Sequence, residues 1–270
     1  MTDAAEARAI NRALWDERAE LHGTSPRDQL YDVAAFLAGA DTLGQPELSL
    51  AGDVAGKDLL HLQCHFGMDT LNWARRGARV TGVDFSAVAL ERARALAAEA
   101  GLEAEFVEAD TQALPATLDG RFDLVMASYG VLVWIGDLGG WFAGAHRALR
   151  PGGTLVLVDF HPLYIMADSV DPVVLDWPYG GGRPIRYPSA GSYADPELAT
   201  TANEAVGYPH SVGEIVTAAA RAGLRVEWLG EHLVADRDSR NMLRQGPDGQ
   251  YRFSFGDADL PVLYSLRALA

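Results

Sequence analysis

One short stretch limits what this chain can fold into. Residues 58–86 read DLLHLQCHFGMDTLNWARRGARVTGVDFS, the pattern of a strand, a turn, a helix and a second strand. Positions 59–62 form the apolar run of a strand buried on both faces, and Gly67 permits a tight turn. The second β-rich run, 79–83, stops at Asp84. Such units place unpaired helix N–H groups and a terminal acid around one crevice, so we expect a doubly wound α/β sheet.

The same crevice predicts a nucleoside ligand. The carboxylate of Asp84 can accept hydrogen bonds from both hydroxyls of a ribose. A dinucleotide site needs glycines spaced G-x-G-x-x-G to wrap a pyrophosphate, but residues 63–67 supply only the last of them. NAD is therefore disfavoured. A ligand with adenosine but no phosphates tolerates side chains at this turn, and S-adenosylmethionine is the common example.

These residues resemble the class I S-adenosylmethionine-dependent methyltransferases. LLHLQCHFG follows the frame of that family's first motif, with His61, Gln63 and His65 where an acid and two glycines are usual. We expect Gln63 to fill space that a glycine would leave open. HLQCHFGMDTL followed by VTGVDFS resembles a bacterial small-molecule subgroup in which this variant turn is usual. The resemblance implies a Rossmann-like sheet of seven strands, the last antiparallel, with helices on both faces.

Later segments follow in the order that the family requires and extend the resemblance over about half the chain. Residues 105–110 resemble the third strand, 122–129 the fourth, and 154–159 the fifth. The resemblance implies S-adenosylmethionine as cofactor and S-adenosylhomocysteine as product. Its implied cofactor contacts are Trp15, Tyr31, Gln63, Gly67, Asp84, Phe85, Asp110, Thr111 and Ser128. For Trp15 and Tyr31, the alternative to a cofactor contact is that both merely pack the N-terminal segment onto the core.

Methyl transfer from a sulfonium requires a nucleophile held in line and water kept out. A hydroxyl or ammonium acceptor would also need a base, and histidine titrates near neutrality. The predicted catalytic residues are His161, His210 and Tyr129, and the predicted substrate contacts are Trp134, Tyr164 and Tyr193. Each histidine also has a structural alternative. His161 could brace the turn at Pro162, and His210 could stabilise the entry to the next helix by ordinary hydrogen bonding. Asp159 is expected to orient the acceptor or His161.

We expect four parts along the chain. Residues 1–50 form an N-terminal helical cap or lid, and 51–160 form the cofactor-binding core. Residues 161–209, rich in proline, glycine and tyrosine, form an irregular substrate-binding insertion. Residues 210–270 complete the core, beginning with a capping box at 211–214. The aromatic residues of the 138–149 stripe, including Trp141, are expected in the core.

The net charge and composition of the chain limit the classes of partner that it can bind. With 22 Lys and Arg against 37 Asp and Glu, the net charge of −15 argues against nucleic acids and anionic membranes. The single cysteine, Cys64, excludes an internal disulfide and is expected to face the core, and no Cys/His cluster indicates a metal site. Without an apolar leader or membrane-length run, a cytoplasmic location is expected. A small-molecule acceptor is expected, and a homodimer is compatible with the sequence.

Two other functions stay open at this point. The altered glycine turn suits a non-catalytic or regulatory S-adenosylmethionine-binding protein. An NAD(P) oxidoreductase with the same type of sheet is disfavoured by the missing glycines.

Overall fold

The computed structural model describes residues 2–25, 27–28, 30–170, 173–238, 240 and 242–270. Its centre is a seven-stranded sheet in the order β10-β15-β5-β4-β1-β2-β3. The five strands from β3 to β5 run parallel, whereas β15 is antiparallel to both β5 and β10. The Rossmann-like sheet with an antiparallel last strand is therefore confirmed. The strands are β1 (Asp58–Leu62), β2 (Arg79–Asp84), β3 (Glu105–Glu108), β4 (Phe122–Ser128), β5 (Leu149–Phe160), β10 (Arg225–His232) and β15 (Leu263–Leu269).

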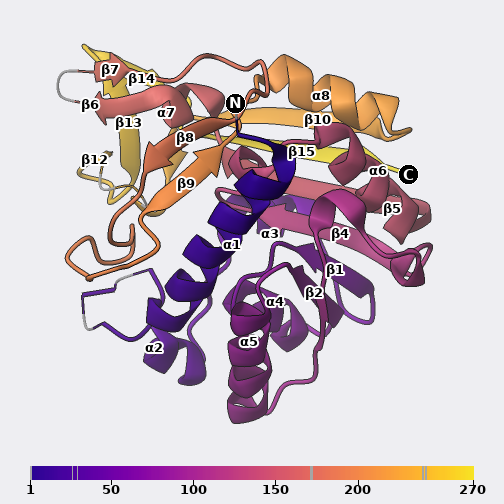
Figure 1. The fold of residues 1–270 in the computed structure, drawn as a ribbon. Coiled ribbons are helices and arrows are strands. Elements are labelled where there is room, and N and C mark those ends of the chain that lie inside the picture. The colour runs from indigo at the N-terminus through magenta and orange to yellow at the C-terminus, as the bar shows by residue number, and fades with distance from the viewer. Residues whose placement is uncertain (1, 26, 29, 171–172, 239, 241) are drawn as a thin grey trace.

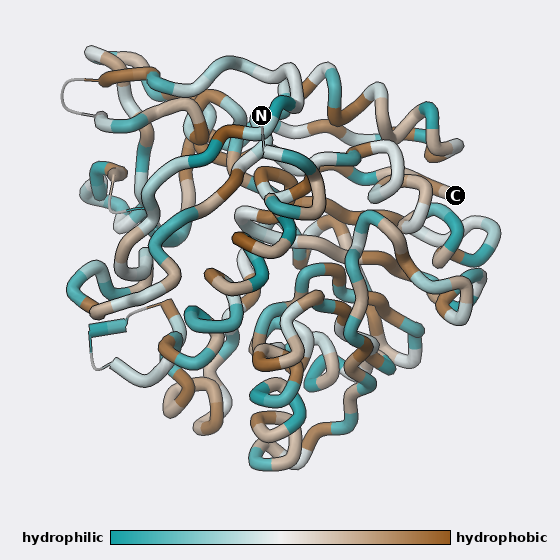
Figure 2. The backbone as a smooth tube through the Cα atoms, viewed as in Figure 1, coloured by the Kyte–Doolittle hydropathy of each residue, from teal (hydrophilic) through white to brown (hydrophobic). Residues whose placement is uncertain are grey.

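Helices cover both faces of this sheet (Figure 1). On one face, α3 (Gln45–Ala51) and α4 (Met68–Arg75) pack on apolar residues of β1, β4 and β5. On the other, α6 (Leu138–Ala148) and α8 (Val212–Arg221) enclose the largest apolar cluster. Along β2 and β3 lies α5 (Ala87–Ala100), whose tube alternates between brown and teal in Figure 2, the mark of one buried face. The 3₁₀ turns are η1 (Thr111–Ala113), η2 (Ala116–Leu118) and η3 (Leu132–Trp134).

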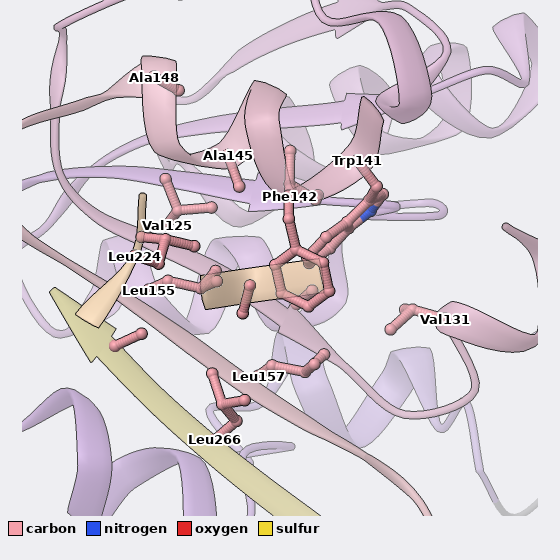
Figure 3. Close-up of a cluster of buried hydrophobic side chains, with 14 of the residues drawn as sticks. Val125, Val131, Trp141, Phe142, Ala145, Ala148, Leu155, Leu157, Leu224 and Leu266 are labelled. Atoms are coloured by element: carbon pink, nitrogen blue, oxygen red, sulfur yellow. The ribbon is translucent and has the colours of Figure 1, made fainter. Parts of the chain in front are cut away.

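Two sequence expectations about this core are confirmed. Trp141 and Phe142 project from α6 toward the strand residues Val125 and Leu157, and all four are completely buried (Figure 3). The capping box is present at the start of α8, where the Ser211 hydroxyl accepts from the Glu214 N–H and the Glu214 carboxylate accepts from the Ser211 N–H.

The N-terminal segment bridges the core and the insertion. It contains α1 (Ala4–Leu21) and α2 (Val33–Leu37). Helix α1 lies between α5 and the hairpin of β8 (Ile185–Pro188) and β9 (Glu204–Gly207) (Figure 1). Asn11 of α1 donates to the Val206 carbonyl and accepts from the Val206 N–H, both at 2.8 Å. On the other side of the helix, the Ser86 hydroxyl donates to Asp16 at 2.5 Å. The helix is thus fixed across the C-terminal ends of the strands.

The segment 161–209 is more regular than its composition predicts, because two hairpins and a short helix occupy it. The residues that separate β10 from β15 in the sequence form a small four-stranded antiparallel sheet, whereas the sequence predicts only a continuation of the core there. These elements are α7 (Pro162–Met166), β6 (Ala167–Val170), β7 (Val173–Leu175), β8 (Ile185–Pro188), β9 (Glu204–Gly207), β11 (Val234–Ala235), β12 (Arg244–Gln245), β13 (Tyr251–Phe255) and β14 (Ala258–Leu260). Among the helices in the described ranges, none has the length and apolar composition needed to span a bilayer.

Candidate functional site

A cavity of about 960 Å³ lies at the C-terminal ends of β1, β2 and β4. Its walls come from the turn after β1, the ends of β2 and β4, helices α1 and α3, and the insertion. The volume lies near the upper limit of about 300–1,000 Å³ that is usual for ligand pockets. The cavity therefore has room for a nucleoside ligand together with a second small molecule.

Backbone strain is concentrated at this cavity. Gln63, His65 and Tyr129 are the described non-glycine residues with positive φ, at 55°, 51° and 56°, and all three line it. Left-handed conformations of this kind cost on the order of 1–3 kcal/mol each and persist where the surroundings impose them. Gln63 and His65 stand where the resemblance expects glycine, so the turn keeps a glycine-like backbone without the glycines. Gly67 has φ 85°, and a Cβ there would lie 3.0 Å from the Ala93 Cβ.

The Gln63 side chain is held at the edge of the turn by its neighbours. Its Nε2 donates to the Val131 carbonyl at 2.9 Å, and its Oε1 accepts from the Trp141 Nε1 at 3.0 Å. Beyond filling space that a glycine would leave open, the Gln63 amide joins the end of β1 to the loop after β4 and to α6. Cys64 faces the core, as predicted, and is 4% exposed.

Asp84 ends β2 on the cavity wall. Its carboxylate accepts from the backbone N–H groups of His65 and Ser86, each at 2.9 Å. Burial raises the pKa of Asp84 to about 6, although these N–H groups act in the opposite direction. The result is a fixed carboxylate beside the turn, with a geometry suited to accepting hydrogen bonds from a ribose diol.

A chain of hydrogen bonds joins the turn to the lid. His22 at the end of α1 bonds through Nδ1 to His65 Nε2 at 2.8 Å and through Nε2 to the Ser192 hydroxyl at 2.7 Å. Tyr31 stacks on His22 with centroids 4.6 Å apart, and its hydroxyl lies 2.5 Å from that of Tyr193. Burial lowers the pKa of His65 to about 3 and lowers that of His22 as well, so both rings are neutral at physiological pH. Neither His22 nor Ser192 was predicted from the sequence.

Tyr129 follows β4 and faces α3. Its hydroxyl donates to the buried carboxylate of Glu47 at 2.6 Å. The next residues are held by Asp159, which accepts from the N–H groups of Gly130 at 2.5 Å and Leu132 at 2.9 Å. Asp159 therefore shapes the loop after β4, which corrects its expected role of orienting the acceptor or His161.

Most of the predicted contact residues meet at this cavity. Those that line it are Trp15, Tyr31, Gln63, Gly67, Asp84, Phe85, Ser128, Tyr129, Trp134 and Tyr193. The rings of Trp15 and Trp134 meet edge to face at 5.4 Å, and Trp15 lies 5.4 Å from the ring of His65. Trp15 and Tyr31 thus both pack onto residues of the core and line the cavity.

Five predicted site residues do not line the cavity. His161 caps α7, accepting from the Leu163 N–H, and its Nε2 lies 2.8 Å from a Glu231 carboxylate oxygen. His210 donates to the Ile135 carbonyl at 2.6 Å, close to the start of α8. Both histidines therefore make structural hydrogen bonds, in agreement with the alternative to a catalytic role.

The other three are placed by local contacts of their own. Tyr164 is fully buried beside β13, with its hydroxyl 3.4 Å from Asp238. Asp110 caps η1 through the Gln112 N–H and pairs with Arg8 of α1 at 3.0 Å, while Thr111 is buried within η1.

Other lining residues come from segments that the resemblance did not cover. They include Arg18, Trp177, Tyr187, Ser189, His232, Arg237 and Arg240. Arg18 left a signal in the sequence, because it lies on the face of α1 that buries Ala7, Asn11 and Leu14. Trp177, Tyr187 and Ser189 belong to the predicted substrate-binding insertion, although none of them was singled out. His232 ends β10, and Arg237 and Arg240 follow β11.

Comparison with known proteins agrees with this geometry. Residues 59–153 match the family model of the methyltransferase domain. A demethylmenaquinone methyltransferase of Thermus thermophilus is 38% identical over 117 residues, which cover 43% of this chain and 52% of the relative. A ubiquinone biosynthesis O-methyltransferase of a Methylobacterium species is 33% identical over 156 residues, which cover 56% and 59%. The chain thus spans little more than half the length of these relatives.

The fold is shared with solved structures. An S-adenosylmethionine-dependent methyltransferase from Mesorhizobium loti aligns with a TM-score of 0.56 and 21% identity, covering 87% of this chain and 100% of that one. This likeness supports the Rossmann-like architecture described above.

Proposed function

We propose that this protein is an S-adenosylmethionine-dependent methyltransferase that transfers the methyl group to a small-molecule acceptor by in-line displacement. The observation that carries the proposal is the fixed Asp84 carboxylate on the wall of a cavity at the ends of β1, β2 and β4. This site lies within the segment that matches the methyltransferase domain. The matched domain and the methyltransferases of the same fold support S-adenosylmethionine as the cofactor.

The residues present fit such a cofactor. Asp84 would accept from the ribose hydroxyls, and Phe85 offers an aromatic face next to it. Gln63 and Ser128, at the ends of β1 and β4, would lie beside the methionine portion. The HLQCHFG turn would serve as a variant first motif, since Gln63 and His65 already hold the backbone that glycines adopt. A pyrophosphate fits less well, because the turn provides a single glycine.

Methyl transfer from a sulfonium depends mainly on how the protein positions the two reactants. When bound, the sulfonium supplies an electrophilic methyl group, so the chain's own residues must position the nucleophile and keep water out. The rings of Trp15, Trp134 and Tyr193 form an aromatic wall that excludes water and attracts positive charge. Tyr129 donates a hydrogen bond to Glu47, which leaves a lone pair on its phenol oxygen free to accept a hydrogen bond from the methyl acceptor.

The acceptor is proposed at the level of a small molecule. The names of two relatives refer to demethylmenaquinone and to ubiquinone biosynthesis, and the insertion adds Trp177, Tyr187 and Tyr193 to the wall of the cavity. The cytoplasmic location and the homodimer stay predictions from the sequence.

The proposal is tested by calorimetry followed by a transfer assay. We expect S-adenosylmethionine and S-adenosylhomocysteine both to bind, and NADH not to bind. A panel of small phenols, acids and amines should then yield S-adenosylhomocysteine with at least one member. Cofactor binding without product across a broad panel would favour the regulatory alternative, and lack of binding by both ligands would refute the proposal.

A further inference from the structure

Arg18 is a buried arginine on the wall of the cavity. It lies on the inner face of α1 and is only 6% exposed, although it lines the cavity. A guanidinium keeps its charge at every physiological pH, so its burial is strongly unfavourable unless an anion lies close by.

Among the described residues, the Arg18 guanidinium has a hydroxyl partner and two aromatic neighbours but no carboxylate in hydrogen-bond contact. One terminal nitrogen donates to the Ser189 hydroxyl at 2.6 Å, while the buried Nε has no hydrogen-bond partner among the described residues. The guanidinium carbon lies 5.6 Å from the Trp15 ring and 5.8 Å from the Tyr193 ring. Glu17, the adjacent acid, accepts instead from the backbone N–H groups of Thr201 and Ala202.

The other arginines of the cavity are satisfied differently. Arg240 donates to the carbonyls of Tyr164 and Ala167, and Arg237 donates to the carbonyl of Thr42. Arg18, by contrast, donates to a hydroxyl, and its planar fork of N–H donors keeps a buried Nε–H without a partner among the described residues. This fork matches the two oxygens of a carboxylate, a pairing for which lysine is a poor substitute.

We propose that Arg18 binds a carboxylate of the molecule bound in the cavity and is neutralised only when the site is filled. The inference deepens the proposed function and rests on it. Two sources offer the same chemistry: the amino-acid end of the methyl donor, or a carboxylate carried by the acceptor.

The donor is tested by comparing two ligands that differ at the carboxylate. Affinities of Arg18→Met and Arg18→Lys for S-adenosylmethionine and for decarboxylated S-adenosylmethionine are measured by calorimetry. If the donor supplies the carboxylate, Arg18→Met loses about tenfold to a hundredfold in affinity for the first ligand and less than about twofold for the second. Arg18→Lys should recover only part of the loss, because it lacks the fork.

The acceptor is tested in protein already saturated with S-adenosylhomocysteine. Benzoate and benzamide serve as matched probes, since they differ in charge and hardly in shape. If the acceptor supplies the carboxylate, wild-type protein binds benzoate more tightly than benzamide, and Arg18→Met removes that preference. S-adenosylhomocysteine affinity then stays unchanged in the variant.

A stability measurement separates ligand binding from a structural role. Replacing a buried, unpaired charge with an apolar side chain should leave the melting temperature of the ligand-free protein unchanged or raise it. Arg221→Met, at an exposed position in the last turn of α8, is the control for loss of one positive charge. It should change neither affinity.

Two results would overturn the inference. One is a melting temperature that falls in Arg18→Met together with equal losses for the acidic and the decarboxylated ligand, which describes a structural arginine. The other is unchanged binding of every probe. Failure of wild-type protein to bind S-adenosylhomocysteine would instead overturn the proposed function, so the two failures are distinguishable.

Discussion

Asp84 should make cofactor binding depend on pH near 6. Burial raises the pKa of its carboxyl to about 6 in the free protein, so the ionised form that best accepts hydrogen bonds from a ribose is lost as the pH falls through that value. We expect the affinity for S-adenosylhomocysteine to be constant above about pH 7 and to fall toward about pH 5. Calorimetry over this range, with Asp84→Asn as a control that cannot titrate, measures the effect. Identical pH profiles for the two proteins would contradict it.

Two histidines near this carboxylate do not titrate in the same range. Burial lowers the pKa of His65 to about 3 and also lowers that of His22, so neither ring gains a proton as the pH falls through 6. The part of a transition near pH 6 that Asp84→Asn abolishes is therefore attributed to Asp84.

Gln63 should stabilise the fold in spite of its strained backbone. Gln63→Gly relieves a positive φ but removes two hydrogen bonds and leaves the Trp141 Nε1 without its partner. Since an unsatisfied buried donor costs about 1–3 kcal/mol, we expect the free energy of unfolding to fall by about 1–2 kcal/mol. Urea denaturation measures this change. A glycine variant more stable than the wild type would show that the strain outweighs the bonds.

At the residue scale, the sequence predicts the positions of residues that depend on neighbouring elements of the chain. Gly67 and Asp84 belong to one strand, turn and helix unit, so their meeting follows from the order of elements. His161 was placed after β5 for the same reason, but its side chain is captured by the N-terminus of α7 and by Glu231, a residue of β10. That contact depends on strand pairing that the local sequence does not encode.

At the scale of elements, the docking of α1 should control access to the cavity. Asn11 makes two buried bonds to the backbone of Val206 in β9, and Asn11→Ala leaves that peptide group unpaired. We expect a loss of about 1–3 kcal/mol in the free energy of unfolding, together with faster S-adenosylhomocysteine dissociation. Denaturant titration and stopped-flow displacement provide the two measurements.

A cap on a distant helix supplies the matched control for this prediction. Ser211→Ala removes the N-terminal cap of α8 and should cost about 0.5–2 kcal/mol without changing ligand dissociation. Equal dissociation rates in both variants would mean that α1 does not gate the site.

The elements that the sequence missed share a physical cause. The helices and core strands have continuous apolar runs or apolar faces, and these were located close to where they lie. The strands β11, β12 and β14 have only two or three residues each, and they form through pairing with β13 rather than through their own propensity. The cavity residues Arg237 and Arg240 lie in this region, so they too escaped prediction.

At the scale of the whole molecule, the charge balance limits the partners. A net charge of −15 repels phosphate backbones. We expect no retention of double- or single-stranded DNA at about 0.15 M salt, as measured by fluorescence anisotropy. Binding that weakens steeply with added salt would contradict this expectation.

Binding of S-adenosylhomocysteine to wild-type protein and to Asp84→Ala, compared by calorimetry, tests the central claim most directly. We predict that the wild type binds and that the variant, folded to the same extent, loses about 1–3 kcal/mol of binding free energy through the missing ribose hydrogen bonds. Equal affinities in the two proteins, or no binding by the wild type at millimolar ligand, would contradict the account.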